Sequence, residues 1–238
     1  MPSARMRGGR AGMKAVMSED TIFREVDEAV RQDQLKSLWN KYGVLVLAAG
    51  LLIVVGVAGY KGWVYWRDKQ ASEAGSRFVG ALQLAESGKE QEARAAFEDL
   101  AKDGPSGYRV LSLFQLAAAE ASSGDKAKAV ADYDALAGDS SVEPMLQGYA
   151  KIRAATLRVD EADKAEIARR VGDLAAAGPW RHSARELLGL ASYKAGDMQE
   201  AQRQFSELLS DPTAPQSLRR RAEMMLALIV KADAAPTQ

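Results

Sequence analysis

Cysteine is absent from the 238 residues, and histidine occurs only once, at position 182. The lack of cysteine excludes disulfide bonds and thiolate chemistry. The sequence also lacks the GxSxG, HExxH, phosphate-binding-loop and dinucleotide-binding motifs. We therefore expect no catalytic site, no metal site and no cofactor. His182, in GPWRHS, is more typical of a turn or helix start than of a catalytic base.

The chain has no excess of either charge, because 32 Lys and Arg residues balance 32 Asp and Glu residues. A nucleic-acid-binding protein needs a clustered basic surface, so we expect no nucleic-acid partner. After residue 75 the sequence shows no apolar alternation of the kind that strands require. The expected fold class is therefore all-α.

Charge is missing altogether from Tyr42 to Tyr60, a run of nineteen residues. At about 1.5 Å per residue, a helix of this length spans roughly 29 Å, close to the ~30 Å hydrocarbon core of a bilayer. Aromatic residues that suit the headgroup level flank the run at Trp39, Trp63, Tyr65 and Trp66. We predict a single transmembrane helix with its interface at residues 42–66. The alternative is a buried core helix, which is seldom apolar on all faces over this length.

The ends of the chain have a different composition. Residues 1–17 are basic, glycine-rich and without apolar periodicity, and we interpret them as disordered or as a misassigned start before Met17. Residues 18–41 carry apolar residues at helical spacing. They predict a cytoplasmic amphipathic helix that docks on a partner, lies on the membrane or prolongs the span. Residues 232–238 are expected to be a disordered tail.

The orientation of the span rests on length, because four basic residues stand within about twenty residues on each side. A short tail obeys the positive-inside rule, whereas a long domain is translocated whatever its charge. We expect a cytoplasmic N-terminus and an external domain at residues 67–231. The apolar run is longer than that of a cleavable signal peptide, so it should remain as an anchor.

Three segments after the span share the pattern GxxxxAxxxΦxxL, where Φ is aromatic. They begin at Gly88, Gly124 and Gly196, which are 36 and 72 residues apart. This spacing predicts a fourth copy near residue 160. There, DEADKAEIARRV places Ala165 at the small position and Arg169 at the aromatic position.

The repeated pattern is typical of stacked helix hairpins. Glycine ends the first helix, the small alanine lets the second helix approach closely, and the aromatic residue and leucine share a buried face. One hairpin cannot cover its own apolar face, so stacking supplies the stability. We predict about four hairpins and a C-terminal capping helix. Helix breakers stand between them at 104–107, 144, 178–179 and 211–215.

These residues resemble the tetratricopeptide repeat, whose second helix has a small residue, an aromatic four residues later and a proline near its end. Ala93, Phe97 and Pro105 match that part, and LGLASY at 188–193 matches its first-helix signal. The tryptophan is missing, and the period is 36 instead of about 34. The SEDTIFREVDEAV segment, one span and degenerate repeats are together similar to YfgM-type ancillary subunits of the bacterial Sec translocon. A related cell-division coordinator family shares the repeat domain.

The resemblance implies a single-pass protein of the bacterial inner membrane with periplasmic repeats. It also implies a concave groove lined by the first helix of each repeat, mostly apolar and suited to apolar segments of unfolded clients. The alternative is that these side chains are ordinary inter-helix core. The implied groove residues are Phe78, Leu82, Phe114, Ala118, Ala150, Leu157, Leu190 and Tyr193.

The final helix, from Pro215 to about Lys231, has more apolar residues than one buried face requires. This excess favours self-association into a homo-oligomer, docking on a partner, or simple packing into the stack. The leading functional prediction is a membrane-anchored, protein-binding scaffold of the Sec translocon that links secreted clients to periplasmic chaperones. The alternative is an envelope scaffold for cell division or cell-wall synthesis. An enzyme is the least favoured reading.

Overall fold

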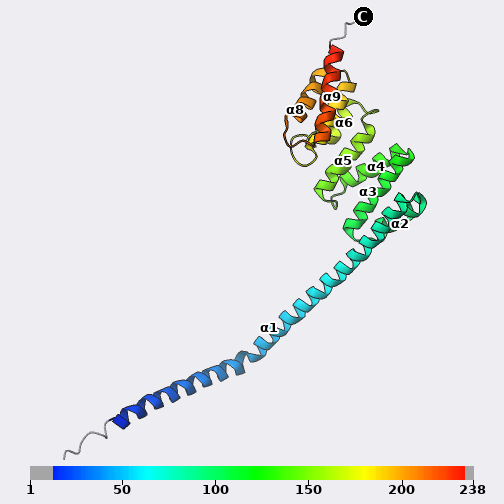
Figure 1. The fold of residues 1–238 in the computed structure, drawn as a ribbon. Coiled ribbons are helices and arrows are strands. Elements are labelled where there is room, and N and C mark those ends of the chain that lie inside the picture. The colour runs from blue at the N-terminus through cyan, green and yellow to red at the C-terminus, as the bar shows by residue number, and fades with distance from the viewer. Residues whose placement is uncertain (1–12, 234–238) are drawn as a thin grey trace, which may run out of the picture. The chain divides into compact units, whose positions relative to one another are not determined.

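The computed structural model describes residues 13–233, with side chains described for residues 36–231. Every regular element in this part of the chain is helical, which confirms the all-α prediction (Figure 1). The chain divides into two compact units, Met1–Asp68 and Lys69–Gln238. The first helix, α1 (Met13–Glu86), contributes residues to both units.

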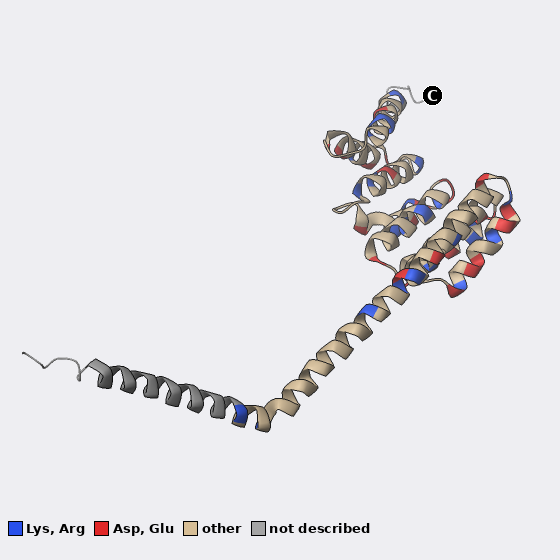
Figure 2. Ribbon diagram, turned by 60° about the horizontal axis from the view of Figure 1, so that its bottom comes forward, with Lys and Arg blue, Asp and Glu red and all other residues tan. Residues whose placement is uncertain are grey.

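In the first unit, α1 exposes apolar side chains around its whole circumference. Each of the ten Val, Leu and Ile residues from Val44 to Val57 is more than half exposed. Figure 2 shows this stretch of α1 as almost free of charged residues. It belongs to the one described helix that is long and apolar enough to cross a membrane.

Helix α1 extends beyond the predicted span in both directions. The helix does not end near residue 66 but continues to Glu86, because no proline interrupts it and its glycines each cost only about 1 kcal/mol. The span and the first repeat helix are therefore one element. The helix also begins at Met13, within residues 1–17, whose interpretation as disordered or as a misassigned start stays a prediction. Residues 1–12 and 234–238 lie outside the described part.

The second unit consists of successive helix hairpins, as predicted. The end of α1 pairs with α2 (Glu90–Asp103), where Phe78 and Ala81 pack with Phe97. Helix α3 (Ser106–Ser123) pairs with α4 (Lys126–Gly138). Next, α5 (Pro144–Arg158) pairs with α6 (Lys164–Val171), which continues into the short 3-10 helix η1 (Gly172–Leu174). The fourth pair is α7 (Arg181–Lys194) with α8 (Met198–Ser210), and α9 (Gln216–Asp233) packs on it.

Glycine closes three of the four hairpins for the predicted reason. Gly88, Gly124 and Gly196 have φ of 77°, 94° and 76°, the left-handed region that other residues avoid. The amide of the following residue then donates back to the first helix; for example, Asp125 N lies 3.0 Å from Glu120 O. This bonding satisfies carbonyl groups that the helix end would otherwise leave unpaired.

The third hairpin differs from the predicted alignment. Helix α6 begins four residues after Asp160, whereas the other second helices begin two residues after their glycine. Ala165 and Arg169 are consequently exposed, and Ile167 and Val171 are fully buried in their place. The predicted roles of Ala165 and Arg169 are therefore wrong. Without a left-handed glycine, the chain leaves α5 through a turn that is two residues longer.

Three of the four hairpins bury the residues that the repeat pattern specifies. The small, aromatic and leucine positions are at most 4% exposed in the first, second and fourth hairpins. Helix α9 buries Leu218, Ala222 and Ile229 against the fourth hairpin. It therefore packs into the stack through one face, while Met224, Leu228 and Val230 stay exposed on its other faces.

Candidate protein-binding surface

Two of the clefts in the repeat domain contain predicted groove residues. The α3–α5 cleft has a volume of about 170 Å³ and is lined by Leu111, Phe114, Gln115, Ala118, Tyr133, Leu146, Tyr149 and Arg153. The α5–α9 groove has a volume of about 600 Å³ and is lined by Ile152, Thr156, Val159, Ser183, Glu186, Leu187, Leu190, Leu218, Arg221, Met224, Met225 and Leu228.

The predicted groove residues fall into two groups. Phe114 and Ala118 line the α3–α5 cleft, and Leu190 lines the α5–α9 groove. The remaining five pack within the hydrophobic clusters, where Ala150 is fully buried and the others are half-buried; they are Phe78, Leu82, Ala150, Leu157 and Tyr193. The structure thus brings three of the eight to a cleft.

Stacked aromatic rings form the wall of the α3–α5 cleft. The ring centroid of Phe114 lies 5.3 Å from that of Tyr149 and 6.0 Å from that of Tyr133. Tyr149 is in turn 5.3 Å from Trp180, whose indole Nε1 donates to Met145 O at 2.8 Å. This chain of rings joins the second, third and fourth hairpins, and it fixes the cleft residues to a packed support.

Gly148 makes the approach of Trp180 possible. A Cβ atom at this position would lie 2.6 Å from Cδ1 of the Trp180 ring, closer than real Cβ atoms come to their neighbours. Trp180 is the N-cap residue of α7, so this contact also sets where α7 starts relative to α5. Sequence inspection missed this pair because its two members are 32 residues apart and neither belongs to the repeat pattern.

Arg153 brings a positive charge to the α3–α5 cleft. Its guanidinium lies 5.7 Å from the ring centroid of Tyr133. The interaction with the Tyr133 side chain is the largest cause that raises the Arg153 pKa. The groups that raise its pKa are Tyr133 and Tyr149, and neither is a carboxylate. The cleft therefore combines aromatic walls with an unneutralised cation.

The α5–α9 groove is mainly apolar. Met224 and Leu228 are exposed along it, and Leu187 and Leu218 form part of its buried wall. The charges of Arg221 and Glu186 neutralise each other there, with Arg221 Nη2 2.9 Å from Glu186 Oε2. Flexible methionine side chains suit a surface that adapts to several partners.

Ion pairs connect consecutive hairpins elsewhere in the stack. Glu120 of α3 is 5% exposed and accepts hydrogen bonds from Lys128 Nζ at 2.7 Å and from Arg94. The hydrogen bond from Lys128, followed by that from Arg94, lowers the Glu120 pKa. Arg170 of α6 similarly reaches Asp134 of α4. These pairs hold the register of the stack.

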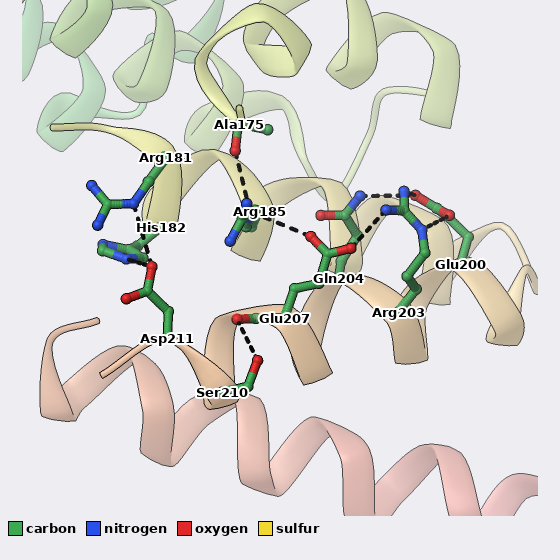
Figure 3. A network of polar contacts seen from close by, with 10 residues as sticks. All are labelled: Ala175, Arg181, His182, Arg185, Glu200, Arg203, Gln204, Glu207, Ser210 and Asp211. Carbon is green, nitrogen blue, oxygen red and sulfur yellow. Dashed lines mark hydrogen bonds and ion pairs between the residues drawn. The ribbon is translucent and has the colours of Figure 1, made fainter. Parts of the chain in front are cut away.

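His182 is a buried connector at the start of α7, as its sequence context indicated. Its Nε2 lies 2.8 Å from Oδ2 of Asp211, and Arg181 points to the same carboxylate (Figure 3). Hydrogen bonds from Thr213, and then the contact with His182, hold the Asp211 pKa well below its ordinary value. The network ties α7 to the turn before α9. The described residues contain no cluster of metal-binding side chains.

Comparison with known proteins agrees with this architecture. The family model of the tetratricopeptide repeat-like domain matches residues 36–230, which is most of the chain. Neither the curated proteins nor the solved structures contain a match. By its family match and its stacked helix hairpins, the chain belongs to the tetratricopeptide repeat-like domain family.

Proposed function

We propose that this protein is a membrane-anchored scaffold whose repeat domain binds other polypeptides. The observation that carries the proposal is the pairing of an apolar helix segment, whose side chains are more than half exposed, with a repeat domain that has clefts for partners. Repeat domains of this kind serve mainly as interaction surfaces. The missing catalytic motifs fit a non-enzymatic role.

Free energy supports membrane insertion of α1. Removing a Val, Leu or Ile side chain from water is worth about 1.5–3 kcal/mol. Ten such residues between Val44 and Val57 therefore outweigh the ~5–15 kcal/mol that stabilises a typical domain. A lipid bilayer takes up this surface and leaves the helical backbone hydrogen bonds intact.

The more specific proposal is an ancillary subunit of the Sec translocon in the bacterial inner membrane. Its support is the resemblance to YfgM-type subunits and the inferred topology, with residues 18–41 in the cytoplasm and the repeats in the periplasm. In this role the two clefts receive translocon subunits, periplasmic chaperones or unfolded secreted clients. The apolar lining of the α5–α9 groove suits chains that have not yet buried their own apolar residues.

The topology is testable because the natural chain has no cysteine. Single cysteines at Ser18 and at exposed Lys126 give probes on the two sides of the span. In intact spheroplasts, a membrane-impermeant maleimide should label Lys126→Cys and spare Ser18→Cys. After detergent lysis both should react. The reverse pattern in spheroplasts would show that the repeats face the cytoplasm.

The partners are testable by site-specific photo-crosslinking in native membranes. A photoreactive amino acid at Ala118 or Leu190 reports on the two clefts, and one at exposed Asp99 serves as the matched control. Cleft positions should recover translocon subunits or secreted clients, and the control should not. Recovery of division or cell-wall proteins would favour the envelope-scaffold alternative, and recovery of neither group would contradict a binding role for the clefts.

A further inference from the structure

The α3–α5 cleft contains a positive charge, that of Arg153, in a largely apolar lining. The Arg153 side chain is half-buried among aromatic and aliphatic residues, and its Nε atom is buried without a hydrogen-bond partner. The tyrosine rings contact this cation but carry no negative charge, so an anion that enters the cleft would supply the opposite charge that the chain does not.

Two other arginines of the same hairpin, Arg158 and Arg170, are neutralised within the chain. Arg158 lies 3.2 Å and Arg170 lies 3.1 Å from Glu166 Oε1. Arg153 stands on α5 only five residues before Arg158, yet it faces Phe114, Tyr133 and Tyr149 in place of a carboxylate. The stack therefore leaves this charge available to an external group.

The shape of the cleft points to one kind of anion. Its volume of about 170 Å³ admits a side chain but not a folded element. A guanidinium presents parallel N–H donors that match the two oxygens of a carboxylate. Exposed Leu111 and half-buried Ala118 lie at the same cleft and offer apolar contact to the residues beside that carboxylate.

From this arrangement, which rests on the proposed protein-binding function, we propose that the α3–α5 cleft selects client segments with an acidic side chain beside apolar residues. The Asp or Glu carboxylate pairs with Arg153, and the neighbouring apolar side chains cover Leu111 and Ala118. The α5–α9 groove, whose charges are already paired, takes apolar segments without this requirement.

The test selects from a random ten-residue peptide library displayed on phage, with the full-length chain held in lipid nanodiscs. Peptides selected by the unmodified protein should share an Asp or Glu next to apolar residues. Replacing that acid by its amide should weaken binding about tenfold, because a charge-assisted hydrogen bond is lost. With Arg153→Gln the amide replacement should change affinity by less than about twofold.

Two further variants control for the fold and for general charge. Arg153→Lys keeps the charge but not the paired donors, so the acid preference should shrink and persist. Exposed Arg169→Gln removes a charge from the same hairpin and should leave the preference unchanged. Circular dichroism of each variant checks that the helices are retained.

Three outcomes separate this inference from the proposed function. Peptides without an acid preference, or a preference that survives Arg153→Gln, overturn the acidic-client inference and leave the scaffold intact. Failure to select any peptide overturns both. An acid preference that disappears with Arg153→Gln and persists with Arg169→Gln establishes the site.

Discussion

The second and third hairpins, α3–α4 and α5–α6, reach the same arrangement by different local means. In the second, Gly124 adopts a left-handed conformation and α4 starts two residues later. In the third, Asp160 stands where the glycine should, and α6 starts four residues later. At both helix starts an aspartate N-cap accepts a hydrogen bond from a backbone amide: Asp125 from Lys128 N, and Asp163 from Glu166 N.

This difference shows that the repeat is defined by the buried face of its second helix more than by the number of residues between the turn and that face. Ala129 and Tyr133 fill the inner positions of α4, and Ile167 and Val171 fill those of α6. The two buried residues of α6 include no aromatic ring, and the larger Ile167 occupies the position that the small Ala129 has in α4. A two-residue insertion is tolerated because surface turns absorb length at little cost.

The largest expected difference in the free energy of unfolding is between two variants of α6. Ile167→Ala should lower the free energy of unfolding by about 2–5 kcal/mol, because it empties a fully buried site. Arg169→Ala should change it by no more than about 0.5 kcal/mol, because this side chain is exposed. Urea denaturation of the full chain in detergent, followed by circular dichroism, measures both. Equal effects would restore the alignment that places Arg169 at the core position.

A second contrast tests the small-residue position. Ala129→Leu should destabilise the repeat domain by about 1–3 kcal/mol, because the alanine is fully buried where α4 packs against its neighbours. Ala165→Leu, on the exposed side of α6, is the matched control and should be nearly neutral. Thermal unfolding of the two variants gives the comparison. A neutral Ala129→Leu would mean that close helix approach is not needed there.

The turns of the second and third hairpins provide a third pair of variants, with a smaller expected difference in stability. Gly124→Ala forces a side chain into the left-handed region and should cost about 1–2 kcal/mol. Asp160→Ala should cost no more than about 0.5 kcal/mol, because this side chain is exposed. The same denaturation experiment applies. A large loss from Asp160→Ala would reveal a role for that carboxylate in closing the turn.

These contrasts also show how far sequence reasoning reached. The glycine turns, the breakers and the buried residues of three hairpins follow from local patterns, so they were predictable. The register of the third hairpin was not, because a strict 36-residue period hides an insertion. The continuity of α1 was missed for a related reason: charged residues after Tyr60 end an apolar run but do not end a helix.

The candidate site was less accessible to sequence reasoning than the fold. Phe114, Ala118 and Leu190 were assigned to a groove by analogy and do line clefts. Tyr149 and Arg153 were missed, since their position beside Phe114 and Tyr133 depends on how successive hairpins stack. An arginine among apolar positions of α5 was the one available signal. Whether these residues bind clients remains a prediction.

The smallest expected effect is the pH dependence of stability that two carboxylates produce, Glu120 in the second hairpin and Glu166 in the third. Hydrogen bonds with Lys128 and Arg94 lower the pKa of Glu120, and hydrogen bonds with Arg158 and Arg170 lower that of Glu166. A lowered folded-state pKa stabilises the protein above the ordinary value of 4.5, and this contribution is lost as the pH falls toward the folded-state value. Both hairpins should therefore weaken in acid.

Substitution by the neutral amide separates the two contributions. Glu120→Gln should be less stable than the unmodified chain at pH 7, and the difference should shrink below about pH 4.5, where the native carboxylate begins to lose its advantage. Glu166→Gln should behave in the same way. Denaturation midpoints from pH 7 to pH 3 measure this convergence. If the Glu120→Gln deficit stayed constant with pH, packing of the side chain, and not its charge, would join the second hairpin to the first.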